Sequence, residues 1–321
     1  MKKKYILVGG SGFVGSALVK LLGEKNCQIF DKENSLLYPE ITKIADVRKP
    51  KQIVFNNNID SLVLLAAEHR DDVSPKSLYY DVNVTGTINI LNKMDEFNIK
   101  SLIFTSSVAI YGLNKNNPDE NHSEDAFNDY GKSKWLAEQE IKKWYEKDPE
   151  GKSVTIIRPT VIFGEGNRGN VYNLLKQMSL GKFIMIGDGL NKKSMAYIGN
   201  IVSFIKNKLE LNQKGYEIYN YADKPDFNMK DLTILVNKKM NLKNRSFYLP
   251  YLIGIIIGCC FDFLSFILGK NLPISTVRIK KFCATTEFNS DKAHKYFEAP
   301  FTLAEGINNT LDHEFNKNQT N

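Results

Sequence analysis

A short apolar run followed at once by closely spaced glycines constrains this chain more than any other feature. Residues 5–8 read Tyr-Ile-Leu-Val, and residues 9–15 read Gly-Gly-Ser-Gly-Phe-Val-Gly, the pattern G-x-x-G-x-x-G. Glycines in such a turn let a strand pass sharply into a helix and let the backbone approach a pyrophosphate closely. The helix that follows would direct its N-terminal amides at that phosphate. We therefore predict a dinucleotide-binding unit at the start of the chain, not a signal peptide, because the apolar run is too short.

Short apolar runs continue to alternate with helical patterns along the first half of the chain. This alternation predicts an α/β fold, a Rossmann-type doubly wound parallel sheet. After Phe163 the pattern loosens, which predicts a smaller C-terminal substrate lobe. We expect an NAD-binding domain at 1–163, to which 193–223 return, and the substrate lobe at 164–321. Further strands are predicted at 27–31, 61–67, 101–107 and 153–158, and helices at 81–97 and 130–145.

An acid at the end of the second predicted strand bears on the choice of cofactor. Asp31 lies where a carboxylate would accept hydrogen bonds from the adenosine ribose hydroxyls. A 2′-phosphate would be repelled by this carboxylate, so NAD is favoured over NADP, although Lys32 follows directly. Asp46 and Val47 come next and could hold the adenine, but a solvated loop acid is an equally good interpretation of Asp46.

A tyrosine and a lysine spaced four apart mark the candidate catalytic centre. On the predicted helix, Tyr130 and Lys134 share one face, so the lysine can lower the pKa of the phenol. A tyrosine tuned in this way can remove the proton of a sugar hydroxyl as hydride leaves. Ser107, at the end of a predicted strand, can hydrogen-bond the same oxygen. The Y-x-x-x-K pair alone is common, but together with Ser107 and the glycine turn it is specific.

These residues resemble the extended short-chain dehydrogenase/reductase family of NAD-dependent epimerases and dehydratases. The resemblance also rests on Asn83 in an N-V-x-G-T element and on Arg158-Pro159-Thr160. It implies Ser107, Tyr130 and Lys134 as the catalytic residues and an NAD that is regenerated in each turnover and stays tightly bound. The cofactor-binding residues it implies are Gly9, Gly12, Phe13, Val14, Gly15, Asp31, Asp46, Val47, Leu65, Ala66, Ala67, Asn83, Ser106, Tyr130, Lys134 and Pro159.

Three segments, 66–75, 158–175 and 193–197, resemble family members that invert C4 of a lipid-linked diphosphate sugar used for surface polysaccharide. The resemblance implies Ser107, Asn170, Lys193 and Arg278 as substrate-binding residues, with Arg168 less clearly among them. Two alternatives stay open: a soluble UDP-sugar 4-epimerase, and a module that binds NAD without catalysis. A dehydratase is disfavoured, because Val108-Ala109 follow the serine where dehydratases carry an Asp-Glu pair.

An apolar stretch at 247–268 with Asp262 as its one charged residue bears on the partner. Its length approaches the roughly 20 residues that a membrane span needs. Its proline, its glycines and Asp262 argue against a simple span, because a charge in hydrocarbon is costly. We weigh a helix that dips into one face of the membrane, a buried helix of the lobe, and a true span. Lys270, Arg278, Lys280 and Lys281 follow and could meet anionic head groups.

Charge and composition exclude other classes of function. The net charge is +7 over 321 residues, and no basic run suggests a nucleic-acid partner. No C-x-x-C pair or His–Cys spacing indicates a metal site, so we expect no metal and four reduced cysteines. His69 lies near the expected site, as a substrate contact or a packing residue. We expect a cytoplasmic enzyme at the inner face of the cytoplasmic membrane, and a homodimer is compatible with the sequence.

Overall fold

The computed structural model describes residues 3–56, 58–70, 73–113, 115–242, 247–270, 272 and 275–316. The chain forms two compact units. The first comprises Met1–Ile162, Ile198–Ala222 and Phe288–Pro300, and the second comprises Phe163–Tyr197, Asp223–Glu287 and Phe301–Asn321. Asp71 and Asp72, which belong to the distinctive segment 66–75, lie outside the described residues.

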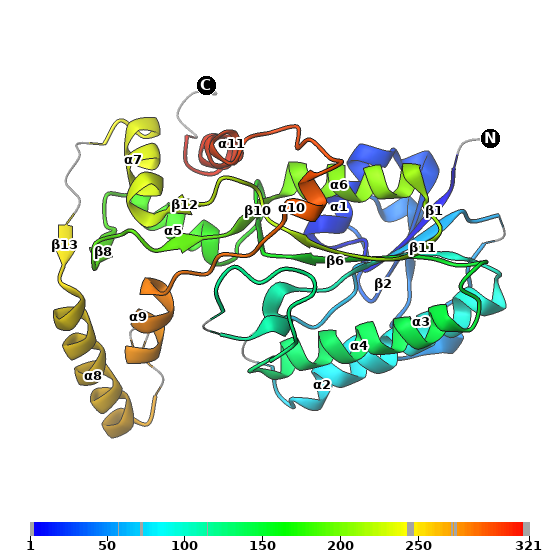
Figure 1. The fold of residues 1–321 in the computed structure, drawn as a ribbon, viewed down its shortest axis with the longest axis horizontal. Helices are drawn as coiled ribbons and strands as arrows, with labels where there is room; N and C mark the ends of the chain where they lie inside the picture. Colours follow the sequence, from blue (N-terminus) through cyan, green and yellow to red (C-terminus); the bar gives the residue numbers. More distant parts are fainter. Residues whose placement is uncertain are drawn as a thin grey trace. The chain divides into compact units, whose positions relative to one another are not determined.

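A seven-stranded sheet, parallel throughout, forms the centre of the first unit (Figure 1). Its strand order is β11-β6-β5-β4-β1-β2-β3, so the chain runs outward from β1 in both directions. This reversal at β1 is the topology of a doubly wound dinucleotide-binding sheet, as the sequence predicted. The strands are β1 (Tyr5–Val8), β2 (Cys27–Asp31), β3 (Thr42–Ile44), β4 (Ser61–Leu64), β5 (Ser101–Thr105), β6 (Ser153–Pro159) and β11 (Gly215–Tyr221).

Helices cover both faces of this sheet (Figure 1). The pair α1 and α6 packs together on one face, and the pair α3 and α4 packs on the other. Strands buried on both faces must be apolar throughout, which explains why β1 reads Tyr-Ile-Leu-Val with all four residues buried. The helices of this unit are α1 (Phe13–Leu22), α2 (Ser77–Tyr80), a π-helical turn (Asp81–Thr85), α3 (Gly86–Glu96), α4 (Asp129–Glu146), α6 (Ile198–Leu211) and α10 (Asp291–His294).

Two predicted strands are shorter than the apolar runs suggested. The run 61–67 leaves the sheet after Leu64, where the N–H groups of Leu65 and Ala66 both donate to Val8 O, at 2.8 and 2.9 Å. The run 101–107 leaves it after Thr105. At both places the chain departs from the ladder at the carboxyl end of a strand, which is where an open α/β sheet forms its site.

Residues 288–300 are a correction to the predicted boundaries, which placed them in the smaller lobe. In the structure they belong to the first unit. Ser290 Oγ donates to Ala222 O at 3.0 Å, and Phe297 packs its ring against that of Phe204 at 5.2 Å. Helix α6 and strand β11 need this apolar cover, and it is supplied from far along the chain. The earlier returning segment spans 198–222, within the predicted 193–223.

The second unit has strands of only two or three residues, and its helices α5, α7 and α11 pack against one another. Strand β8 pairs in parallel with β13, and β9 pairs antiparallel with β12. Strand β7 (Val161–Phe163) runs across the boundary of the two units. The other elements are α5 (Asn170–Ser179), β8 (Ile184–Ile186), β9 (Lys192–Lys193), β10 (Met195–Tyr197), β12 (Phe227–Asn228), α7 (Met229–Lys239), β13 (Phe247–Leu249), α8 (Tyr251–Leu268), α9 (Thr276–Cys283) and α11 (Leu303–Phe315).

The aromatic cluster around Phe204 should carry much of the stability of the first unit. Phe204 is fully buried, and its ring contacts those of Tyr219, Tyr221 and Phe297. Because truncation would leave a cavity, we expect Phe204→Ala to lower the free energy of unfolding by about 3–5 kcal/mol. Urea unfolding of the purified protein measures this loss. The control Leu36→Ala removes an exposed side chain and should change stability by less than about 0.5 kcal/mol.

Candidate active site

The glycine turn between β1 and α1 is shaped by close backbone approaches. Gly9 has a φ of +83°, and a Cβ there would lie 2.4 Å from Ala66 N. A Cβ on Gly15 would lie 2.4 Å from Gly10 Cα, so this glycine lets α1 pack onto the turn. Gly12 is the N-cap of α1, without a side-chain cap and with no acid in the first turn. Gly12 thus offers no side-chain acceptor to the first amides of α1, those of Phe13 and Val14, and such a helix N-terminus suits an anion.

Asp31 lies at the end of β2, beside this turn. Its carboxylate accepts the backbone N–H of Ser11 at 3.0 Å and that of Glu33 at 3.2 Å. A carboxylate accepts about four hydrogen bonds, so acceptor capacity is left for a ribose diol. The neighbouring Lys32 is exposed and lies 3.9 Å from Glu33 Oε1. A cation already opposite an acid is a weak partner for a 2′-phosphate, which favours NAD.

Asp46 and Val47 follow β3, and the structure gives them different surroundings. Arg48 holds the Asp46 carboxylate in an ion pair at 2.5 Å, and this hydrogen bonding lowers the pKa of Asp46. The Asp46 N–H donates to Gln52 Oε1 at 3.1 Å. Val47 is buried against Gly86, where a Cβ would lie 2.6 Å from Val47 Cγ2. A contact of Asp46 and Val47 with the adenine stays a prediction. Of the two residues, Val47 has the apolar side chain that could pack against the adenine ring.

Ser106 follows β5 and is 3% exposed. Among the residues that the structure describes, its buried Oγ has no hydrogen-bond partner. An orphaned buried hydroxyl is costly, and it points to a polar ligand that the protein alone does not provide. The half-buried Leu65, Ala66 and Ala67 follow the neighbouring strand β4, and the buried Pro159 ends β6. All of these residues lie at carboxyl ends of strands, so the described site fits a dinucleotide.

Asn83 proves to be a connecting residue of the π-helical turn. Its Oδ1 accepts the Glu68 N–H at 2.8 Å, and its Nδ2 donates to Glu68 O at 3.0 Å and to Ser133 Oγ at 2.9 Å. Ser133 in turn donates to Tyr130 O at 2.8 Å. These bonds engage both amide hydrogens of Asn83, so it ties the loop after β4 to the helix of Tyr130.

Tyr130 lies in the first turn of α4, where Asn128 caps the helix by accepting the Gly131 N–H at 2.8 Å. Ser107 follows β5, and its hydroxyl accepts the Ala109 N–H at 3.1 Å. The structure brings the two side chains together. Burial raises the pKa of Tyr130, and the hydrogen bond with Ser107 acts in the opposite direction. The serine therefore favours the phenolate, the form that can receive a proton.

Lys134 is buried one helical turn after Tyr130, with 1% of its surface exposed. Its Nζ lies 4.2 Å from the centre of the Phe104 ring. Burial lowers the pKa of Lys134 to about 7, and the charge of Glu138 counteracts this. The sequence predicted that Lys134 would lower the pKa of the phenol. In the protein chain alone, burial is the largest influence on the pKa values of Tyr130 and Lys134, because it disfavours the charged form of each group.

A buried ion pair under Lys134 is the part of the site that sequence reasoning missed. Glu138, one turn further along α4, accepts Arg158 Nη2 at 2.6 Å and Nε at 3.0 Å, and both side chains are at most 3% exposed. Arg158 Nη1 also donates to the Tyr111 hydroxyl at 2.8 Å, which donates to Asn220 Oδ1 at 2.8 Å. An acid four residues after Lys134 was the available signal, because it shares the face of the lysine.

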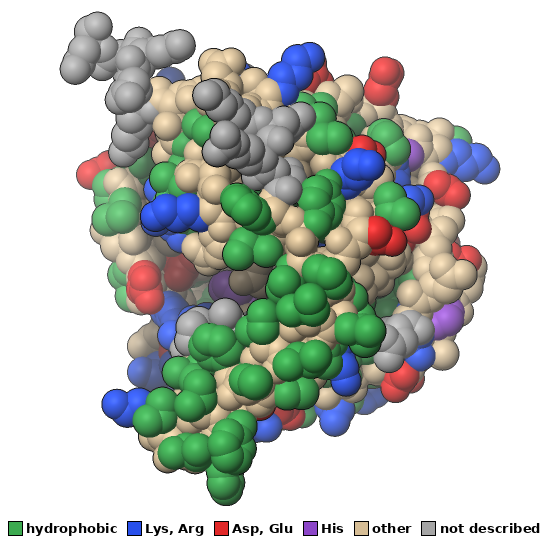
Figure 2. All heavy atoms as spheres, turned by 90° about the vertical axis from the view of Figure 1, so that its left-hand side faces the viewer, with side chains coloured by type: hydrophobic (Ala, Val, Ile, Leu, Met, Phe, Trp, Pro, Cys, Tyr) green, Lys and Arg blue, Asp and Glu red, His purple; other side chains and the backbone are tan. Residues whose placement is uncertain are grey.

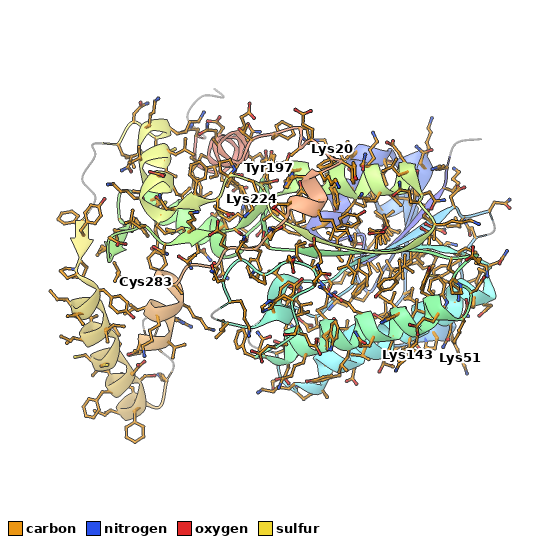
Figure 3. The ribbon with its side chains drawn as sticks, in the orientation of Figure 1. Lys20, Lys51, Lys143, Tyr197, Lys224 and Cys283 are labelled. Carbon is orange, nitrogen blue, oxygen red and sulfur yellow. The ribbon has the colours of Figure 1, made fainter. Side chains whose placement is uncertain are left out.

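Of the residues expected to bind substrate, Ser107 lies in the first unit, and the other three lie in the second unit on three elements. Asn170 is exposed and begins α5. Arg278 is exposed in the first turn of α9, and its Nη1 donates to Leu272 O at 3.4 Å. Lys193 Nζ donates to Lys281 O at 3.0 Å and Ala284 O at 2.6 Å, at the end of α9 where Cys283 also lies (Figure 3). Burial lowers the pKa of Lys193 to about 8.

Arg168 and His69 are two further candidates for contact with the substrate. Arg168 pairs with Glu314 at 2.7 Å and lies over the Tyr172 ring, so its charge is already balanced inside the second unit. His69 is exposed in the loop after β4. Across the described ranges, no group of three or more His, Cys, Asp or Glu side chains could hold a metal ion.

The fold and this site define an NAD-dependent enzyme that works on a hydroxyl-bearing carbon. A family model described as the NAD dependent epimerase/dehydratase family matches residues 5–222. The chain belongs to this family, and NAD is the family's cofactor.

The chain is also similar to individual proteins of this family. The chain is 57% identical over 318 residues to the N-acetyl-alpha-D-glucosaminyl-diphospho-ditrans,octacis-undecaprenol 4-epimerase of Escherichia coli O157:H7, covering 98% of this chain and 96% of that protein. It is 28% identical to the UDP-glucose 4-epimerase of Vibrio cholerae, and the match covers 74% of this chain and 77% of that protein. The UDP-N-acetylglucosamine 4-epimerase structure from Bacillus cereus shares the fold, with a TM-score of 0.75, 16% identity and coverage of 97% and 99%.

The lowered pKa of Lys134 predicts a pH-dependent stability. The folded protein releases this proton near pH 7, whereas an unfolded lysine keeps it to about pH 10.4, so the unfolded state binds more protons in between. The difference in unfolding free energy, wild type minus Lys134→Met, should therefore rise with pH above 7, by at most about 1.4 kcal/mol per pH unit. Urea unfolding at pH 7, 8 and 9 measures it.

The matched control for this measurement is Lys132→Met. Lys132 is exposed on the same helix, two residues before Lys134. Its substitution should leave the pH dependence of the wild type unchanged. An identical pH dependence in wild type and Lys134→Met would contradict the buried, weakly basic lysine.

Proposed function

We propose that the chain inverts C4 of GlcNAc-diphospho-undecaprenol to give GalNAc-diphospho-undecaprenol, an isomerase reaction that serves surface polysaccharide synthesis. The observation that carries this proposal is the identity of 57% to the E. coli lipid-linked epimerase, which extends over 98% of this chain. Such an end-to-end match includes the second unit, where substrate specificity would reside. The Ser107–Tyr130 pair and the buried Lys134 provide the chemistry that an epimerase needs.

Tyr130 is the proposed general base, and Ser107 the group that orients the reacting hydroxyl. Bound NAD would accept the hydride from C4 and return it to the opposite face of the 4-keto sugar. Tyr130 takes the proton of the 4-hydroxyl as the hydride leaves and gives it back when the hydride returns, so the reaction is redox-neutral. Ser107 has a single O–H, which it donates to the phenolate oxygen of Tyr130 and, once Tyr130 holds the proton, can donate to the oxygen of the sugar. Lys134, when protonated, favours the phenolate.

The chain's own groups suggest how the dinucleotide would be held. The turn with Gly9, Gly12 and Gly15 and the amides of Phe13 and Val14 would receive the pyrophosphate, and Asp31 the adenosine ribose. We assign Val47, with Asp46 beside it, to the adenine. Leu65, Ala66, Ala67, Ser106 and Pro159 would line the remainder of the cofactor site, and Asn83 would position it through Glu68 and Ser133.

Positive groups of the second unit would bind the diphosphate. We assign this role first to Arg278, because its exposed guanidinium offers several donors in a planar fork. Asn170 at the start of α5 would contact the diphosphate or the sugar. Lys193 would have to leave the carbonyl oxygens of Lys281 and Ala284 to bind a phosphate, so its assignment is secondary.

A lipid-linked substrate would place the enzyme at the inner face of the cytoplasmic membrane. Helix α8 is long and apolar enough to cross a bilayer by length and composition, and among its eighteen residues only Gly254 and Gly258 are buried. We propose that α8 brings the protein to the membrane surface. A homodimer stays a prediction that sedimentation of the purified protein would test.

The main alternative is a soluble UDP-sugar 4-epimerase. The similarity to the UDP-glucose 4-epimerase of Vibrio cholerae supports this alternative. Supplying GlcNAc-diphospho-undecaprenol and UDP-GlcNAc separately distinguishes the two, with the galacto epimer as the measured product. We expect conversion of the lipid-linked sugar. Conversion of the UDP-sugar alone would overturn the proposal, and conversion of neither, with NAD bound, would favour a non-catalytic module.

Tyr130→Phe should reduce kcat at least about 100-fold, because it removes the general base. The bound NAD, measured from the absorbance of the released cofactor, should stay at the wild-type level. Tyr145→Phe, the same substitution at the other end of α4, is the matched control and should keep normal turnover. Loss of NAD from the Tyr130 variant would show a structural role instead.

A further inference from the structure

Helix α8 exposes an apolar surface that no described part of the chain covers. Hydrophobic side chains gather along this helix (Figure 2). Scattered apolar residues are normal on a protein surface, but a contiguous patch marks an interaction site. The large exposed hydrophobic residues of α8 are Tyr251, Leu252, Ile253, Ile256, Phe263, Leu264, Phe266, Ile267 and Leu268.

The opposite side of α8 is occupied by the same chain. A Cβ on Gly254 would lie 2.7 Å from Ile186 Cγ2 of β8, and a Cβ on Gly258 would lie 2.9 Å from the Thr276 backbone of α9. Two glycines spaced by four could otherwise form a close contact with a second membrane helix. Here α9 and β8 fill that stripe, so the large side chains point elsewhere.

Asp262 continues the same stripe, four residues after Gly258. Its carboxylate accepts the backbone N–H of Thr276, at 3.1 Å, in the first turn of α9. An acid there satisfies an orphan amide and matches the helix dipole. The one charge of the apolar stretch is therefore retained on the protein side of α8, where it holds α8 and α9 together as a hairpin.

The hairpin also carries a one-sided charge. After Asp262, residues 263–286 contain four basic side chains and no acidic one. Gly269 ends α8 in the left-handed conformation with φ of +60°, and Lys270 follows it. The four cations, each exposed, are Lys270, Arg278, Lys280 and Lys281. Exposed cations beside an apolar face match an anionic lipid surface, where each adds roughly 1 kcal/mol of attraction.

We propose that the α8–α9 hairpin is a one-leaflet membrane anchor, in which the outward face of α8 enters an anionic bilayer while Asp262 and α9 stay at head-group level. A spanning α8 would have to leave α9, which would strip Asp262 from Thr276 and carry its charge into hydrocarbon. An α8 lying in the interface keeps every one of these contacts. This anchor is a specific form of the membrane association proposed for α8. Its purpose rests on the proposed function, because a lipid-linked substrate lies in the membrane.

Vesicle flotation of the full-length protein tests the surface. We expect the wild type to float with vesicles of phosphatidylglycerol and phosphatidylethanolamine, and to float less with phosphatidylcholine alone or in high salt. The double variant Phe263→Glu/Phe266→Glu should bind at least about tenfold more weakly, because two charges enter the apolar face. The matched control Leu36→Glu/Leu37→Glu changes two exposed apolar residues of the first unit and should float normally.

Equal unfolding temperatures and NAD contents must accompany the comparison, so that lost binding reports on the surface and not on folding. Flotation of the α8 variant at the wild-type level would overturn the anchor. So would a wild type that stays with the soluble fraction, or one that binds vesicles only through another added protein.

The depth of insertion is tested with single cysteines at the two ends of α8. Tyr251→Cys and Lys270→Cys are made in a chain in which Cys259, Cys260 and Cys283 are replaced by serine, and a membrane-impermeant maleimide is applied. Both positions should react in inside-out vesicles and neither in intact cells. Reaction of the two ends from opposite sides would mean a span and would overturn the one-leaflet anchor.

The two proposals can fail separately. Vesicle binding without turnover of GlcNAc-diphospho-undecaprenol would remove the proposed substrate and leave the anchor in place. Turnover of that substrate in detergent, with no flotation of the protein, would remove the anchor and leave the proposed function in place.

Discussion

The buried ion pair between Glu138 and Arg158 holds helix α4 to the sheet. It joins α4 to β6, and through Tyr111 and Asn220 it reaches the loop after β5 and the edge strand β11. A buried pair of this kind contributes little net stability, because desolvation offsets the attraction, yet loss of one partner is costly. Its value here is geometric, since it fixes the helix that carries Tyr130 and Lys134 and places a negative charge beside the buried lysine.

A related arrangement orders the second unit. Helix α9 has the carboxylate of Asp262 at its N-terminal end and the ammonium of Lys193 at its C-terminal end. Each charge opposes the partial charge of that end of the helix, which is the favourable sense. Because Arg278 lies on α9, the same contacts connect the apolar helix α8 with the residue that we assign to the diphosphate. The proposed lipid-linked sugar carries both an apolar chain and a diphosphate, so it would need an apolar surface and a cation close together.

Local pattern was sufficient for much of this protein. The strand β1, the turn at Gly9 and the helix α1 were predictable because their periodicity and glycines act within about twenty residues. Helical spacing placed Tyr130 and Lys134 on one face, and Ser107 with the glycine turn made the pair specific. The ends of β4 and β5 were not predictable, because no residue at 65–67 or 106–107 marks locally where the strand stops pairing. Residues 288–300 were misplaced because their partners, Phe204 and Ala222, lie far away in the sequence.

The sequence by itself determined the parallel sheet and the dinucleotide turn and supplied the candidate catalytic residues, since each is recognised from short local motifs. Tertiary structure decided their electrostatics. Burial lowers the pKa of Lys134, Glu138 counteracts it, and Ser106 keeps a buried hydroxyl without a partner among the described residues. It also decided that the Asp262 carboxylate accepts the Thr276 N–H at the start of α9. Desolvation and such long-range pairings depend on which segments meet in space, and no local pattern records that.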